Sequence, residues 1–280
     1  MFHMEAFRSS LSSGTTNVFQ QVTYITAGAV LAPSGSGLQV AAELPFLHSL
    51  FGVGANLENI QPQAASFQPL PYPTFSPNNK GTAAEAIPRL WDFSYAPKAL
   101  RPTEFFNVFA SQNSGGAETE AVFVQFTDNR PATAPPIATG PAINGNGMFT
   151  TVHATAGVTL TANAWSQVTP TLDSPLPAGT YALVGARVQS AGALAFRVSP
   201  VTGPLWKPGG VAVQSQDAAD APNQRFFNPI TGKHSNWGIW MTFFQNVFPY
   251  VQIWSTSADT TENMWFDLIK LSDATTSNAL

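Results

Sequence analysis

Charged side chains are scarce in this sequence. Asp, Glu, Lys and Arg make up 10% of its 280 residues, against about 25% in an ordinary soluble domain. Because charged groups are costly to remove from water, they are depleted at the cores of protein interfaces. With 44% hydrophobic residues and so little charge, the sequence predicts a protein that covers much of its surface with copies of itself.

Other absences narrow the classes of protein further. Cysteine is absent, which excludes disulfides, thiolate metal sites and cysteine nucleophiles. No stretch approaches the ~20 consecutive apolar residues of a membrane-spanning helix, and the segment MFHMEAFRSSLSSG lacks the apolar core of a signal peptide. The 12 Lys and Arg are scattered and the net charge is -4, so we expect no direct nucleic-acid binding.

Catalytic and cofactor motifs are missing as well. The chain has no Gly-x-Ser-x-Gly nucleophile turn, no phosphate loop and no dinucleotide fingerprint. Its histidines, none of which has a partner at metal-ligand spacing, are His3, His48, His153 and His234. We therefore expect a protein that is not an enzyme and carries no cofactor, with its histidines in structural or surface roles.

Close pairs of carboxylates are the remaining candidates for chemistry. The pairs are Glu118 with Glu120, Asp217 with Asp220, and Asp259 with Glu262. Two carboxylates can act as acid and base or bind calcium, and calcium at a subunit junction is one hypothesis. Solvated turns, or for Asp217 and Asp220 the first turn of a short helix, are the simpler interpretation.

The 23 Pro and 21 Gly favour many short strands and turns over long helices. In the first half, strands are expected in NVFQQVTYIT, GAVLAP, LQVAAELPF, RLWDFSY, FFNVFASQ and AVFVQFTD. LPFLHSLFGVGANL (44–57) is predicted as a short helix, with Pro45 in its first turn and Gly52 and Gly54 at its end.

The second half predicts strands more clearly. Its eight candidates are FTTVHATAG, WSQVTPTLD, GTYALVGARVQS, ALAFRVSP, GVAVQSQ, GIWMTFFQ, PYVQIWSTS and MWFDLIKLS, separated by turn-forming residues. Asp217 to Gln224 is predicted as one helical turn. Strands of this number and spacing indicate β-sandwiches rather than βαβ units.

These patterns divide the chain into four parts. We predict an N-terminal arm at 1–16, a first β domain at 17–128, a linker at 129–147 and a second β domain at 148–280. The linker, NRPATAPPIATGPAINGNG, is rich in Pro, Gly and Ala. Two β halves of similar length suggest that one architecture is repeated, although no residue-level repeat is visible.

Aromatic and apolar side chains are the candidates for self-association. They crowd the last 45 residues, and along GIWMTFF both faces of the expected strand carry large apolar groups, which is unlike a strand with one face in water. A core covered by loops of the same chain, a face packed on a sister domain or subunit, and a sugar-stacking platform all fit this pattern. The candidates are Phe2, Phe7, Leu11, Trp237, Trp240, Phe244, Trp254 and Trp265.

On its two β blocks, 17–128 and 148–272, the chain resembles the double jelly-roll major capsid proteins of tailless icosahedral viruses, many of them membrane-containing phages. LPAGTYALVGARVQSAGALAFRVSP and FFNVFASQNSGGAETEAVFVQFTDN resemble corresponding hairpins of such rolls. The resemblance is one of architecture, size and charge scarcity. It implies two tandem eight-stranded jelly-roll β-sandwiches with short helical inserts. A single jelly roll with an elaborated N-terminal region is the alternative fold.

The resemblance also implies a function and partners. The chain would be a major capsid protein located in the virion shell, where it forms a homotrimer that tiles the shell and contacts other virion proteins. Its N-terminal arm would tie it to neighbours or to an internal lipid membrane. The alternative function is a carbohydrate-binding or adhesive β-sandwich, such as a lectin module or tail-fibre head, with exposed aromatics that stack on sugars.

Overall fold

The structure is a computed structural model. It describes residues 2–12, 17–54, 56–76, 91–93, 97–113, 116–128, 147–201, 206–212 and 239–273, without the side chains of 91 and 92. The chain forms two compact units, each described separately below. The first comprises Phe2–Asn129 with Asn163–Trp165, and the second comprises Arg130–Ala162 with Ser166–Leu280.

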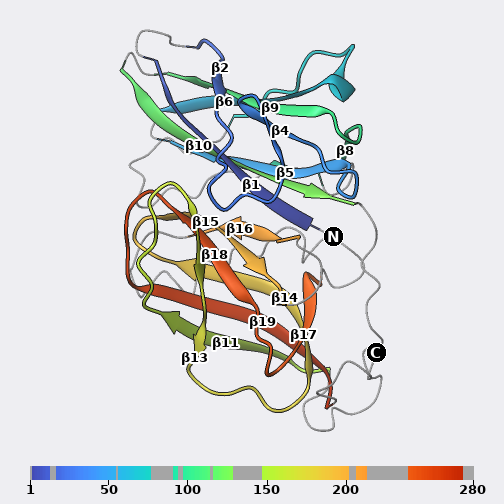
Figure 1. Cartoon of the computed structure of the whole chain (residues 1–280), viewed down its shortest axis with the longest axis vertical. Coiled ribbons are helices and arrows are strands. Elements are labelled where there is room, and N and C mark those ends of the chain that lie inside the picture. Colours follow the sequence, from blue (N-terminus) through green and yellow to red (C-terminus); the bar gives the residue numbers. More distant parts are fainter. Residues whose placement is uncertain are drawn as a thin grey trace. The chain divides into compact units, whose positions relative to one another are not determined.

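The first unit has two antiparallel sheets. In one, β1 (Phe2–Leu11) pairs with β10 (Glu118–Thr127), which pairs with β5 (Phe46–Val53). Two short strands, β7 (Trp91–Asp92) and β8 (Lys98–Ala99), extend β5 on its other side. β10 therefore lies in the interior of this sheet, between β1 and β5 (Figure 1).

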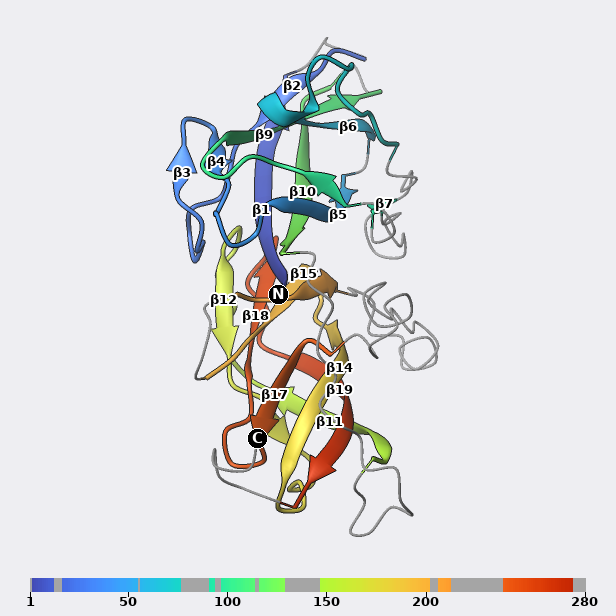
Figure 2. The same cartoon turned by 90° about the vertical axis from the view of Figure 1, so that its right-hand side faces the viewer.

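The other sheet is built around β9 (Phe105–Gln112). Along one edge β9 pairs with β6 (Leu57–Ala64), and along the other with β2 (Gln20–Val22) and β4 (Gly37–Gln39). β3 (Pro33–Ser34) closes a hairpin with β4. In Figure 2 the sheet with β6 and β9 lies above the one with β5 and β10, which is the layering of a β-sandwich.

The second unit repeats this plan. Its first sheet has the order β13-β11-β19-β14-β17 and its second the order β12-β18-β15-β16. The strands of the first sheet are β11 (Phe149–Ala156), β13 (Thr171–Leu172), β14 (Thr180–Gln189), β17 (Met241–Phe244) and β19 (Glu262–Ser272). Those of the second are β12 (Trp165–Val168), β15 (Ala193–Ser199), β16 (Gly209–Val211) and β18 (Tyr250–Ser255).

In each unit, strands from the start of that unit pair with strands from its end in nested order. In the second unit the pairs are β11 with β19, β12 with β18, β14 with β17, and β15 with β16. In the first they are β1 with β10, β2 and β4 with β9, and β5 with β7 and β8. The innermost pair there is a single bridge between Ile60 of β6 and Phe75.

This nested order is the signature of the jelly roll. If the eight strands of a roll are lettered B to I along the chain, each unit has one sheet in the order B-I-D-G and another in the order C-H-E-F, with the Phe75 bridge standing in place of strand F in the first unit. We call the units the first roll and the second roll. The chain is thus an all-β tandem of two jelly rolls, as the sequence predicts.

Each roll closes around phenylalanines whose rings meet edge to face or, for Phe7 with Phe106, at a tilt. In the first roll, Phe106 lies 6.2 Å from Phe7 and 5.2 Å from Phe126, measured between ring centroids. In the second, Phe248 lies 5.1 Å from Phe243 and 4.9 Å from Phe266. Residues two apart along a strand share a face, so the even-numbered residues of β10 and β19 point into the cores.

Two expectations are wrong. The segment predicted as a helix at 44–57 contains β5, and the only helical element among the described residues is a 3-10 turn, η1 (Ala65–Phe67). An eight-residue apolar run suits a strand buried on both faces as well as a helix, and Leu47 through Gly52 are all buried.

The second correction concerns the N-terminal arm. Residues 2–11 form β1, which pairs with β10 along its whole length. Phe7 and Leu11 are almost completely buried, so this segment is an integral strand of the first roll. The predicted linker at 129–147 lies outside the described residues except for Gly147. The linker and the domain limits drawn on either side of it therefore stay predictions.

The eight strands expected in the second half are all present, two of them shorter than predicted and one divided into β12 and β13. The predicted helical turn at Asp217 to Gln224 lies outside the described residues. Across the part of the chain that the structure describes, no helix is long and apolar enough to cross a membrane.

Candidate functional site

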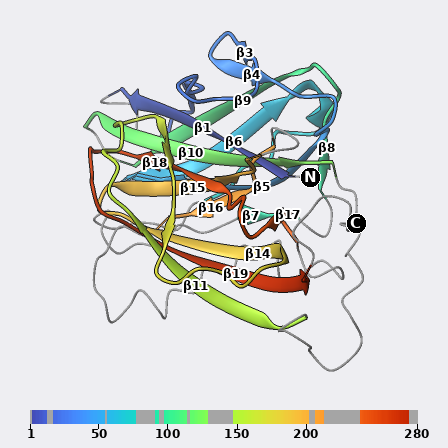
Figure 3. The same ribbon diagram turned by 60° about the horizontal axis from the view of Figure 1, so that its bottom comes forward.

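A row of polar and aromatic side chains crosses the outer face of the second roll. His153 of β11, Trp265 of β19 and Arg187 of β14 are direct neighbours in register, on strands that lie side by side (Figure 3). The His153 ring lies 5.0 Å from the Trp265 ring, and the Arg187 guanidinium carbon lies 6.0 Å from it, a cation–π distance. Trp265 is half-buried.

A second row lies beside the first. The carboxylate of Asp267 accepts hydrogen bonds from Thr151 Oγ1 at 2.6 Å and from Arg187 Nη2 at 3.2 Å. Asp267 is 5% exposed, so this partly buried ion pair is shielded from solvent more than a surface pair is. Opposite Asp267 stands Gly185, whose missing side chain leaves room for the carboxylate.

One predicted carboxylate pair, Glu118 and Glu120, lies where β10 begins. Glu120 is fully buried, and neither of its carboxyl oxygens has a hydrogen-bond partner. Burial, followed by the nearby charge of Glu118, raises the pKa of Glu120 to about 7. Glu118 is half-buried and accepts a hydrogen bond from Asn56 Nδ2 at 2.7 Å.

A second predicted pair, Asp259 and Glu262, lies where β19 begins. Glu262 is fully buried. Its Oε2 accepts a hydrogen bond from the Val158 backbone N–H at 3.2 Å, while Oε1 has no partner. Burial raises the pKa of Glu262, and this effect exceeds the opposing one of the Val158 hydrogen bond.

Asp259 behaves in the opposite way. Burial acts to raise its pKa, but hydrogen bonds from Ser190 Oγ and from three backbone N–H groups outweigh that effect and lower it. Two of these donors are Ala191 N–H at 2.6 Å and Thr260 N–H at 2.8 Å. The pKa values of these two neighbouring carboxyls are therefore shifted in opposite directions.

Neither pair makes a metal site on its own. Within the described ranges, no three side chains of His, Cys, Asp or Glu come together as metal ligands do. The third predicted pair, Asp217 and Asp220, lies outside those ranges. Calcium at a subunit junction stays a hypothesis.

The histidines have structural surroundings. His3 Nε2 lies 2.6 Å from Glu5 Oε1, and both side chains are fully buried. The same oxygen accepts hydrogen bonds from the backbone N–H groups of Val30 and Leu31. His48 is buried and meets Phe2 edge to face.

The fourth histidine, His234, lies outside the described ranges. His153 of the outer row is more exposed, and its Nδ1 lies 2.6 Å from Asp173 Oδ2. The latter pair is a surface interaction of small energetic weight.

The predicted self-association residues divide by burial. Phe7, Leu11 and Trp254 are at most 1% exposed, so they are core residues and cannot present a surface to another chain. Trp240 is also mostly buried, at 9% exposed. The candidates that remain partly exposed are Phe2, Phe244 and Trp265, and Trp237 lies outside the described residues.

Sequence reasoning missed the apolar side chains that are most exposed. Leu70 and Phe105 in the first roll are 72% and 61% exposed, and Met148 and Phe149 in the second are each 57% exposed. Phe149 and Phe105 each stand at the first position of a strand. Position at a strand end was the available signal, because the inward-outward alternation breaks down there.

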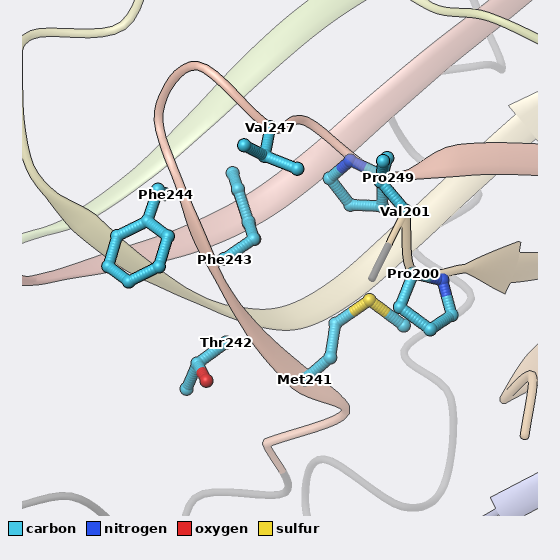
Figure 4. Close-up of a pocket in the computed structure, with 8 residues that line it drawn as sticks. All are labelled: Pro200, Val201, Met241, Thr242, Phe243, Phe244, Val247 and Pro249. Carbon is cyan, nitrogen blue, oxygen red and sulfur yellow. The ribbon is translucent and has the colours of Figure 1, made fainter. Parts of the chain in front are cut away.

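A small apolar pocket of about 60 Å³ lies in the second roll. Met241 reaches toward Pro200 across it, and Phe243, Phe244 and Val247 line the other side (Figure 4). Thr242 is the only lining residue with a polar side chain. A pocket of this size fits one small side chain and is far below the volume of ordinary ligand sites.

Comparisons with known proteins give weak likenesses. No family model matches the chain, and no curated protein matches its sequence. Among solved structures, the major capsid protein P2 from bacteriophage PM2 is 10% identical, with a TM-score of 0.25, over 96% of this chain and 97% of that one. The PBSX exported protein XepA is 11% identical, with a TM-score of 0.22, over 96% of this chain and 86% of that one.

The fold assignment therefore rests on the strand order of the chain itself. The B-I-D-G and C-H-E-F orders occur in both units, with strand F reduced to the Phe75 bridge in the first, and the two units follow one another along one chain. In its fold, the chain resembles the double jelly-roll major capsid proteins.

Proposed function

We propose that this chain is the structural unit of a virion shell. It associates with copies of itself as a homotrimer, and the trimers tile an icosahedral capsid together with other virion proteins. The observation that carries the proposal is the tandem repeat of the jelly-roll strand order in one chain. The step from fold to role is an analogy, since jelly rolls also serve as lectins and cupins.

Charge scarcity supports the analogy. An interface that buries few charges avoids the cost of desolvating them, and a chain with 10% charged residues has large areas that can leave water in this way. Both rolls also expose large apolar side chains at strand ends, Phe105 in the first and Phe149 in the second. We assign these two residues to contacts between copies.

The membrane partner suggested by the resemblance loses its structural basis. It depended on an N-terminal arm, and residues 2–11 are instead paired and largely buried in β1. We keep contacts with copies of the chain as the proposal and leave the lipid contact out of it.

Sedimentation velocity tests this proposal. We expect the full chain to sediment as a trimer or larger species, and Phe105→Ser and Phe149→Ser to shift it toward monomer without lowering its melting temperature. Val201→Ser is the matched control, because Val201 is also exposed, at 41%, but is not assigned to a contact. A chain that stays monomeric at high concentration contradicts the proposal.

One observation favours a second candidate function, carbohydrate binding. Trp265 is half-exposed and is flanked by His153 and Arg187, a mixture of aromatic and polar groups that sugars can use. Because both neighbours already contact the ring, less of its face is left for a sugar, and we place this function second. Saturable tryptophan quenching by glycans that is lost in Trp265→Phe would favour it over the shell.

A further inference from the structure

A fully buried glutamate lies at the same place in both rolls. Glu120 is the third residue of β10 and Glu262 is the first residue of β19. Each of these strands is the last of its roll and follows a connection that crosses from the other sheet. Each glutamate also shares a face with core residues two positions on, Val122 and Met264.

Their surroundings are poor in hydrogen-bond donors. Both oxygens of Glu120 and one oxygen of Glu262 have no hydrogen-bond partner. An ionised carboxylate in such a place loses its hydration without compensation, whereas a protonated carboxyl loses much less. Gly54 follows β5, and a Cβ atom there would collide with Glu120 Oε2, so the fold leaves the space above Gly54 for this carboxyl.

The charged groups around Glu120 do not offset its burial. On its own strand the nearest is Glu118, which repels a second negative charge. In β1 it faces Ser9, and the adjacent Arg8 belongs to the opposite face of the sheet because side chains alternate.

Glu262 has a similar environment. It faces Ala156 of β11, and the turn that follows contributes only the Val158 N–H. The connection between β18 and β19 contributes Asp259, whose charge also disfavours ionisation of Glu262. Among the residues that the structure describes, no Lys, Arg or His forms an ion pair with either glutamate.

We propose that Glu120 and Glu262 are a matched pair of proton switches, each of which fastens the start of the last strand of its roll. While the carboxyls carry their protons, the starts of β10 and β19 stay packed. When a proton is lost, the carboxylate turns toward water and the start of that strand loosens. The raised pKa of about 7 for Glu120 places its switch near neutrality. The inference does not depend on the proposed shell function.

Hydrogen exchange of the full chain at two pH values tests this. After correction for intrinsic exchange, we expect amides at the start of β10 to lose about tenfold or more protection between about pH 5.5 and 8.5, and amides at the start of β19 to lose protection as the pH rises. Glu120→Gln mimics the protonated side chain and should keep the start of β10 protected at both pH values. Glu262→Gln should do the same for the second roll only. Glu43→Gln, at an exposed position, should behave as wild type.

Three results would overturn the inference. Equal protection at both pH values in the wild type would show that no switch exists. Loss of protection that persists in both glutamine variants would assign it to other groups. If Ca²⁺ alone restored protection at high pH, the carboxyls would be identified as ligands of a cation rather than as proton switches. If a variant fails to fold, infrared titration of the buried carboxyl bands in the wild type shows directly whether these carboxyls lose their protons over the same pH range.

Discussion

The carboxyl group of Glu120 occupies the space above Gly54 that a side chain at position 54 would need. The two residues belong to neighbouring strands of the first roll, Glu120 to β10 and Gly54 to the turn just after β5. The absence of a Cβ at one position is therefore coupled to the burial of a carboxyl at the other.

This coupling predicts a non-additive double mutant. Gly54→Ala should lower the free energy of unfolding by about 1–3 kcal/mol, because the added methyl group displaces a buried side chain. In a Glu120→Ala background the same change should cost much less, since the space is then empty. Urea unfolding of the four proteins measures the coupling, and additive effects would show that the two residues do not share this space.

The raised pKa of Glu120 predicts a fall in stability as the pH rises. The folded protein holds this proton up to about pH 7, whereas the unfolded chain releases it near 4.5. The unfolded state is therefore favoured progressively between these values, and the loss levels off above them at up to about 3 kcal/mol. Glu262 acts in the same direction.

Urea unfolding from pH 4 to 9 checks this prediction. The curve of Glu120→Gln should be flatter than that of the wild type over the same interval. A wild type whose stability rises through the interval, or a variant with an unchanged curve, would contradict the assignment.

The placement of Phe7 in β1 predicts a folding defect rather than an assembly defect. Phe7 is fully buried against Tyr24 and Phe106, so Phe7→Ala should cost about 3–5 kcal/mol of stability. A flexible arm would tolerate the change. Thermal unfolding monitored by circular dichroism distinguishes a buried strand from a flexible arm. An unchanged melting temperature would support the flexible arm.

The failure of the arm prediction has a physical cause. The segment FHMEAFRSSL contains His3 and Glu5, and their partners, the backbone N–H groups of Val30 and Leu31, lie more than twenty positions away. Without these partners the segment looks too polar for a buried strand. β5 was mistaken for a helix for a related reason: both of its faces are buried, so its apolar residues show no alternation.

The second roll could be predicted strand by strand because its strands are bounded by Gly, Pro, Asn and Ser turns. The carboxylate pairs could be located from spacing alone, but their burial could not. Whether Glu120 lies in water or in a core depends on Gly54 and Ser9, which approach it only when three strands align. The same is true of the Trp265 row, which requires three strands in register.

The ion pair on the outer face of the second roll gives a further prediction. Arg187→Ala leaves the buried carboxylate of Asp267 with Thr151 as its remaining side-chain donor among the described residues. Because a buried charge that loses its partner is destabilising, we expect a loss of about 1–3 kcal/mol. Arg187→Lys should recover part of it. Chemical denaturation measures both, and equal stability of Arg187→Ala and wild type would show that the pair contributes nothing.

The most direct test of the central claim is electron microscopy of the full-length protein at high concentration. The proposal predicts trimers with a pseudo-hexagonal outline, six rolls around one axis, that pack into sheets or closed shells. Isolated two-lobed particles at every concentration would contradict it.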